Sequence, residues 1–154
     1  MRIYAVDPGP TSSGVVLYSV TSRKVLRSEK ATPNEDVLLG ILALRSSIVV
    51  AVERVQAQGI AGNDLMRTCE WSARFAQAAI DSGHVLRWHY RREVCRHLHV
   101  TGAGKDAQVR ARCIELHGGD RRTAQGVKAS PGPLHGVGGH AWQALGLALL
   151  VADL

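Results

Sequence analysis

Residues 1–20 read MRIYAVDPGPTSSGVVLYSV. An apolar run ends at Asp7, a Pro-Gly-Pro turn follows, and a second apolar run begins after Gly14. This pattern predicts one strand over 2–7 and another over 13–20. A carboxylate at the end of a buried strand is costly to desolvate. We therefore expect Asp7 to serve a function.

The rest of the chain continues this hairpin into alternating helices and strands. Further strands are predicted over 24–30, 48–52 and 84–89. Helices are predicted over 34–45, 63–81, 91–98, 105–117 and 140–152. The Gly- and Pro-rich stretch 118–139 is predicted to be a loop, and Asn34 is a candidate N-cap. A hairpin followed by βα alternation is typical of an α/β mixed sheet with helices on its faces, here in a single domain over residues 1–154.

The composition favours an ordinary globular chain, with 45% hydrophobic and 21% charged residues. No apolar stretch reaches the ~18 residues that a membrane span needs, and no signal-peptide pattern opens the chain. The three cysteines, Cys69, Cys95 and Cys113, fit neither a disulfide framework nor a zinc ribbon. We therefore expect reduced thiols and a cytoplasmic protein. Cys69 and Cys113 fall at helical core positions, where burial is expected.

The net charge of +6 is spread evenly along the sequence. A basic excess on a folded body suits a polyanion partner such as nucleic acid. The same excess also suffices for solubility alone, so charge by itself leaves both interpretations open.

Two predicted strands end on a carboxylate, one at Asp7 and one at Glu53, each after four apolar residues. If these strands are parallel neighbours, both acids emerge at the same edge of the sheet. Like charges in a buried site repel unless a cation lies between them, and Mg²⁺ prefers oxygen ligands. The pair therefore predicts a metal site, whereas either acid alone is also explained by a helix cap or an ion pair with arginine.

The closing helix brings a histidine that is a candidate for the same site. His140 lies in its first turn, and Gln143 follows one turn later on the same face. An imidazole there can act as a metal ligand or a general base. The alternative is a polar residue that only caps the helix.

The segment GAGKDAQVRARCIELHG, residues 102–118, carries basic side chains at a predicted helix start. Lys105, Arg110 and Arg112 are suited to contact phosphate there. The alternative is a solvated helix face on which Asp106 balances the charge.

These segments resemble, in order and spacing, the RuvC family of Holliday-junction resolvases, which are RNase H-like nucleases. The matching pieces are IYAVDPGPTSSGVVL, VVAVERV, GKDAQVRARCIELHG and GHAWQALGLALL, and they extend over residues 3–150. The compact length and the ending SPGPLHGVGGHAWQAL are similar to phage or prophage-borne members. The resemblance implies an RNase H-like mixed five-stranded sheet flanked by helices, and a homodimer acting on four-way DNA junctions.

The resemblance also implies roles for individual residues. It implies two-metal phosphodiester hydrolysis with Mg²⁺ or Mn²⁺, two ions per active site. Asp7 would bridge the metals, Glu53 would hold one of them, and His140 matches the first ligand position on the last helix. Lys105 lies beside the family's basic position and would contact the scissile phosphate, although Asp106 shifts that match by a residue.

Two departures from the family pattern affect these expectations. Gln143 stands where the family usually has a second acid, so the site has two carboxylates and a neutral histidine, and we expect weaker metal binding with a preference for Mn²⁺. The loop after Glu53 reads RVQAQGIAG and lacks the aromatic wedge of some resolvases, with Gln56 in its place. Further DNA contacts are expected from Arg54, Arg91 and Arg92, while Trp88 and Trp142 are assigned to the core.

The leading hypothesis is a metal-dependent endonuclease that cleaves Holliday junctions and other branched DNA. One alternative is a protein of the same fold that binds branched DNA but cuts it weakly or not at all. An RNA-processing nuclease on this fold is a second alternative. The Asp-x-Gly turn is also found in actin-like and sugar-kinase-like ATPases, which need a second nucleotide-binding subdomain that this length does not supply.

Overall fold

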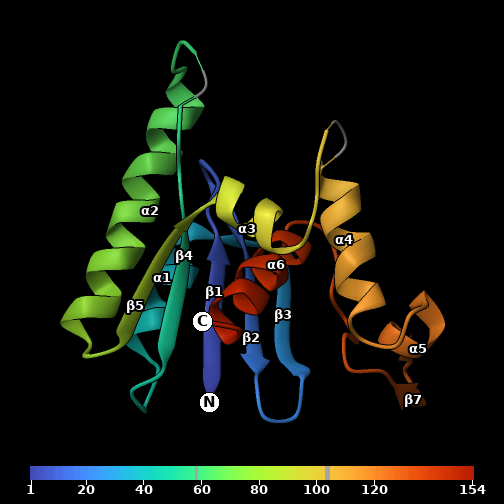
Figure 1. Ribbon diagram of the computed structural model, residues 1–154. Helices are drawn as coiled ribbons and strands as arrows, with labels where there is room; N and C mark the ends of the chain where they lie inside the picture. The colour runs from blue at the N-terminus through green and yellow to red at the C-terminus, as the bar shows by residue number, and fades with distance from the viewer. Residues whose placement is uncertain (58, 103–104) are drawn as a thin grey trace.

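The computed structural model describes residues 1–57, 59–102 and 105–154. Five strands form one mixed sheet in the order β3-β2-β1-β4-β5 (Figure 1). They are β1 (Arg2–Asp7), β2 (Ser12–Ser19), β3 (Lys24–Pro33), β4 (Val49–Arg54) and β5 (Val85–Tyr90). The first three strands are antiparallel neighbours, and β1, β4 and β5 run parallel. The predicted five-stranded mixed sheet is confirmed.

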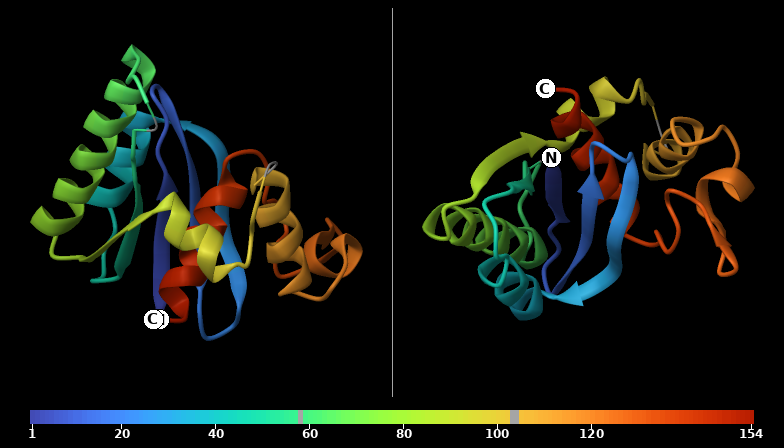
Figure 2. Two further views of the ribbon diagram at one scale, coloured as in Figure 1. Left: turned by 45° about the horizontal axis from the view of Figure 1, so that its top comes forward. Right: turned by 90° about the horizontal axis from the view of Figure 1, so that it is seen from below.

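Helices cover both faces of this sheet. The described helices are α1 (Asn34–Leu42), α2 (Asn63–Asp81), α3 (Arg91–His97), α4 (Lys105–Glu115), α5 (Arg121–Gln125) and α6 (Ala141–Ala152). Figure 2 shows α1 and α2 on one side of the sheet and α6 on the other, with α3 and α4 beyond α6. In the described part of the chain, no helix is long and apolar enough to cross a bilayer.

The strand β1 is buried on both faces, which explains its unbroken apolar run. Ile3 and Ala5 pack into the core shared with α6, whereas Tyr4 and Val6 pack into the core shared with α1 and α2. Successive side chains of a strand point to opposite faces, so each parity serves one core. Parallel strands buried in this way lack the polar alternation of a half-exposed sheet.

The closing helix α6 is buried almost all round. The sheet covers one side of it, and α3 and α4 pack on the other. A Cβ atom added at Gly146 would lie 3.0 Å from Val109 and 3.2 Å from Val94. The glycine therefore allows α3 and α4 to approach the helix closely, which closes the second core.

The prediction of a loop over 118–139 is wrong in part. This stretch contains α5 and a two-stranded hairpin of β6 (Gly126–Val127) and β7 (Ser130–Pro131). Asp120 caps α5 by accepting a hydrogen bond from the Thr123 amide at 3.0 Å, and Leu134 is fully buried. The Asp-x-x-Thr cap is a local signal that the density of glycine and proline concealed.

Burial differs from expectation at two positions. Cys69 is exposed, whereas Cys95 and Cys113 are buried. Trp88 is 37% exposed, because β5 is an edge strand. Its assignment to the core is therefore wrong, while that of Trp142 is confirmed at 5% exposure.

Candidate active site

The sheet register places Asp7 and Glu53 side by side. β1 and β4 are parallel, with Val6 opposite Val52, so each acid is the next residue of a neighbouring strand. By the two-residue alternation of a strand, both carboxylates share the α6 side of the sheet with Ala5. The expectation that the two strands are parallel neighbours ending at one edge is confirmed.

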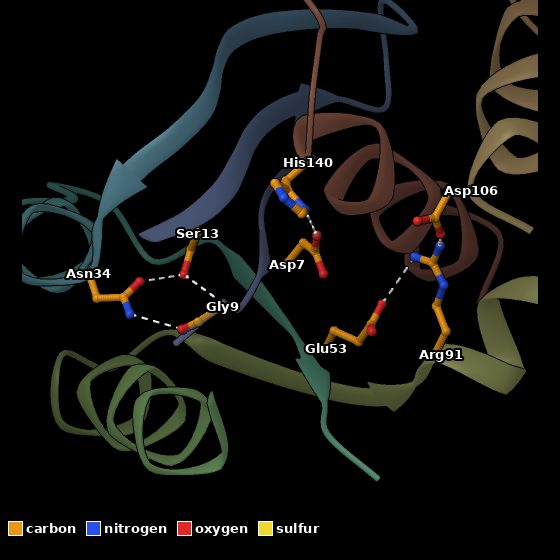
Figure 3. Close-up of polar contacts among 8 residues, drawn as sticks. All are labelled: Asp7, Gly9, Ser13, Asn34, Glu53, Arg91, Asp106 and His140. Atoms are coloured by element: carbon orange, nitrogen blue, oxygen red, sulfur yellow. Dashed lines mark hydrogen bonds and ion pairs between the residues drawn. The ribbon is translucent and has the colours of Figure 1, made fainter. Parts of the chain in front are cut away.

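A buried hydrogen-bond network anchors the turn after Asp7 (Figure 3). The Ser13 hydroxyl donates to Asn34 Oδ1 at 2.6 Å and accepts from the Gly9 amide at 3.4 Å. The Asn34 side-chain amide donates to the Gly9 carbonyl at 3.0 Å. Asn34 is fully buried and makes no capping hydrogen bond to α1, so its prediction as an N-cap is wrong. It satisfies the turn's polar groups instead, which fixes the end of β1.

A close backbone approach brings His140 to Asp7. Gly14 pairs with Asp7 across the β1–β2 ladder, and a Cβ atom at Gly14 would lie 2.4 Å from the carbonyl carbon of His140. A glycine at this position is therefore required for the start of α6 to lie against β2. The His140 Nδ1 atom is 3.3 Å from Asp7 Oδ2, and the imidazole is 73% exposed. Its hydrogen bond to Asp7 raises the pKa of His140, and burial opposes this rise.

Glu53 is held in an unfavourable electrostatic position. Its side chain is only 15% exposed. Burial, followed by the negative charge of Asp7, raises the pKa of Glu53 to about 7, and the positive charge of Arg91 opposes the rise. Two carboxylates therefore converge in a site that destabilises their charged forms, which is the setting in which a bound cation is favourable.

Arg91 occupies the space beside these acids. Its Nη1 atom lies 3.5 Å from Glu53 Oε2, and its Nη2 atom donates to Asp106 Oδ1 (Figure 3). Asp106, expected from the sequence to balance charge on a solvated helix face or to shift the match at Lys105, therefore reaches the site. Within the described ranges, no three His, Cys, Asp or Glu side chains form a group that could hold a metal ion as they stand. The carboxylates are contacted by Arg91 and His140.

A cleft of about 540 Å³ opens over this group. Its lining includes Asp7, Glu53, Arg91, Asp106, His140 and Gln143, together with the turn 8–12 and Thr68. Gln143 is 7% exposed, and its Oε1 atom has no hydrogen-bond partner among the residues described. A buried acceptor without a partner is costly, and an amide oxygen is a suitable ligand for Mg²⁺ or Mn²⁺. The donor set of two carboxylates, one imidazole and one amide oxygen therefore fits a divalent cation.

Most of the predicted basic residues border this cleft. Arg54, Gln56, Arg92 and Lys105 line an adjoining hollow of about 290 Å³ that also contains Glu53 and Arg91. Arg110 lines another hollow, of about 480 Å³, on the side of His140 and Gln143. Arg112 lies apart from this group in an ion pair with Glu115 at 2.7 Å. DNA contact by these residues stays a prediction.

The sequence did not predict a place beside the cleft for Lys30, Arg121, Trp88 and Tyr90. Lys30 and Arg121 join Arg110 in its hollow. Arg54 stacks 4.8 Å from the Trp88 ring and 5.1 Å from the Tyr90 ring. The spacing of the two aromatics, two apart on one strand, was the available signal, because it places both rings on one face.

No protein-family model and no curated protein sequence matches this chain. Solved structures of RuvC do match its fold. T. thermophilus RuvC in complex with a Holliday junction substrate superposes with a TM-score of 0.61 at 21% sequence identity, over 97% of this chain and 92% of that chain. Another structure of Thermus thermophilus RuvC superposes with a TM-score of 0.60 at 23% identity, again over 97% and 92%. The chain therefore has the RuvC fold, an RNase H-like mixed sheet flanked by helices.

Proposed function

We propose that this protein is a divalent-metal-dependent endonuclease that cleaves Holliday junctions and related branched DNA. The observation that carries the proposal is the pairing of Asp7 and Glu53 at one sheet edge, beneath an open cleft. The buried Gln143 oxygen, which has no hydrogen-bond partner among the described residues, also lines this cleft. The fold supports it, since a solved RuvC of this fold is in complex with a Holliday junction substrate. The chain's net charge of +6 suits DNA.

The residues of the cleft divide into ligands and phosphate contacts. Asp7, Glu53 and Gln143 would hold the metal through oxygen, and His140 would join them through Nδ1, the atom that now faces Asp7. Two Mg²⁺ or Mn²⁺ ions, when bound, supply an activated water and stabilise the leaving oxygen. Lys105 would contact the phosphate beside the cleft.

The proposed substrate has two strands to cut, which favours a homodimer. A two-fold symmetric pair would present two identical sites to a four-way junction. On α2, Met66 and Ile80 are each 54% exposed, which supplies apolar surface for such a contact. Sedimentation of the purified protein tests this point, and a monomer at micromolar concentration would contradict it.

The decisive experiment is a nicking assay on a synthetic four-way junction in Mg²⁺ and in Mn²⁺. We expect Asp7→Asn and Glu53→Gln to abolish cleavage while binding persists, because each removes one of the central carboxylates. The control is Asp81→Asn, at the exposed end of α2, which should cut normally. Linear duplex and structured RNA serve as competing substrates. Cleavage by either active-site variant at the wild-type rate would refute the proposal.

A branched-DNA-binding protein without cleavage is the second candidate. It is favoured by the Arg91 guanidinium, which joins Glu53 and Asp106 and offsets part of their charge without any metal. The same assay separates the two candidates, because this one binds the junction tightly and leaves it intact in both metals.

A further inference from the structure

A single arginine joins two carboxylates that come from distant parts of the chain. Glu53 is the second-last residue of β4, Asp106 lies in the first turn of α4, and the Arg91 guanidinium contacts both. Their carboxylates are therefore only one guanidinium apart. Asp106 lines the same cleft as Asp7 and Glu53.

The charge of Asp106 acts on the proposed ligands. It contributes to raising the pKa of Glu53 and also that of His140. Its side chain is 81% exposed, so packing does not hold it in its present rotamer. Arg91 is 27% exposed and lines the same cleft.

Gln143 independently indicates that this cleft has a ligand position without a negative charge. Its Oε1 atom is buried in the cleft wall without a hydrogen-bond partner in the described structure. This oxygen offers a ligand but no charge, so α6 adds nothing to the two negative charges of Asp7 and Glu53. A third carboxylate within reach of the same space would increase the attraction for a dication.

We propose that Asp106 is the third carboxylate of this site and binds the divalent cation directly, after leaving Arg91. In the structure, Arg91 partly offsets the negative charge of Glu53 and Asp106. Both carboxylates would hold the cation when it is bound, and the Arg91 guanidinium would then be available to DNA phosphate. This inference rests on the proposed metal-dependent function and assigns Asp106 and Arg91 complementary parts in it.

The test measures Mn²⁺ binding to the full chain without DNA by isothermal titration calorimetry. Asp106→Asn should weaken Mn²⁺ binding by about tenfold or more, as expected for loss of a group that supports a metal site. Glu53→Gln is the positive control. Glu115→Gln is the matched control, because it removes one negative charge from the other end of the same helix, and its affinity should equal that of wild type. Melting curves in chelator establish that each variant is folded.

Arg91→Gln separates a metal role from a structural one. If Arg91 competes with the cation for Glu53 and Asp106, this variant should bind Mn²⁺ more tightly than wild type. If the Arg91–Asp106 pair only positions α4, Arg91→Gln and Asp106→Asn should lower the melting temperature and leave the Mn²⁺ affinity unchanged. That second result overturns the inference.

The outcomes also distinguish this inference from the proposed function. Wild-type affinity in Asp106→Asn, with weak binding in Glu53→Gln, overturns the role of Asp106 and leaves the metal site intact. Absence of Mn²⁺ binding by the wild-type protein at millimolar concentration overturns both. If the added change Gln143→Asp restores Mn²⁺ binding in Asp106→Asn, this supports a site that needs a third carboxylate from either position.

Discussion

Replacement of Glu53 by glutamine should stabilise the metal-free protein while it abolishes cleavage. The pKa of Glu53 rises from 4.5 to about 7 on folding, chiefly because of burial and then because of Asp7. At 1.36 kcal/mol per pKa unit, keeping Glu53 ionised above pH 7 costs the native state about 3 kcal/mol. Glutamine removes this cost. It also removes the ion pair with Arg91, which lowers the gain in stability by up to about 1 kcal/mol. The net gain of about 2 kcal/mol corresponds to a melting temperature about 4–8 °C higher.

The stability gained by Glu53→Gln should depend on pH. Because the folded pKa of Glu53 lies above the unfolded one, the native state holds the proton more tightly, and wild-type stability falls as pH rises from 4.5 to about 7. The advantage of Glu53→Gln should therefore be near its maximum at pH 8 and small at pH 5. The melting temperatures of wild type and Glu53→Gln are measured by calorimetry in the presence of a chelator.

The refuting result is equally specific. If Glu53→Gln melts below wild type at pH 8, or if its advantage is the same at pH 5 and pH 8, the carboxylate is not destabilised as argued. Glu115→Gln, on an exposed helix end, controls for the loss of one charge and should change stability by less than about 0.5 kcal/mol.

Three further predictions concern the surroundings of the site. Gly14→Ala should lower the free energy of unfolding by about 1–3 kcal/mol and reduce cleavage, because its Cβ would lie 2.4 Å from the His140 carbonyl carbon. An unchanged melting temperature would show that the two backbones separate freely. Arg54→Gln should lower the salt slope of junction binding by about 1, measured by fluorescence anisotropy, and an unchanged slope would remove Arg54 from the interface. Burial lowers the pKa of His117 from 6.5, so the native state resists its protonation. The stability deficit of His117→Gln at pH 8 should therefore shrink below pH 6.5 in thermal melts, whereas a constant deficit would contradict this.

The two central acids could be predicted from the sequence because the apolar pattern of a buried strand is a local feature of the chain. Four apolar residues before Asp7 and before Glu53 predicted two buried strands, and parallel pairing then placed both acids at one edge. His140 followed from its place at the start of the last helix. The helical and strand periodicities also predicted the five-stranded sheet.

The remaining features depend on contacts between distant segments and could not be predicted in this way. Asn34 has the residue type of a helix cap, yet the turn after Asp7 offered its amide better partners. Gly14 looked like an ordinary turn residue until α6 packed on it. The joining of Glu53 and Asp106 by Arg91 links three elements, and no spacing along the chain predicts such a meeting.

The electrostatics of the metal-free site account for both candidate functions. Folding brings Asp7 and Glu53 together at a cost, which the Arg91 guanidinium beside Glu53 and the His140 imidazole beside Asp7 partly offset. A dication that displaces Arg91 would gain the attraction of the carboxylates and free the guanidinium for DNA phosphate. If Arg91 holds these carboxylates more strongly than the metal does, the proposed site would bind DNA without cutting it. On the proposed function, the balance between Arg91 and the metal at Glu53 would therefore decide between cleavage and binding alone, and metal affinity in Arg91→Gln measures that balance directly.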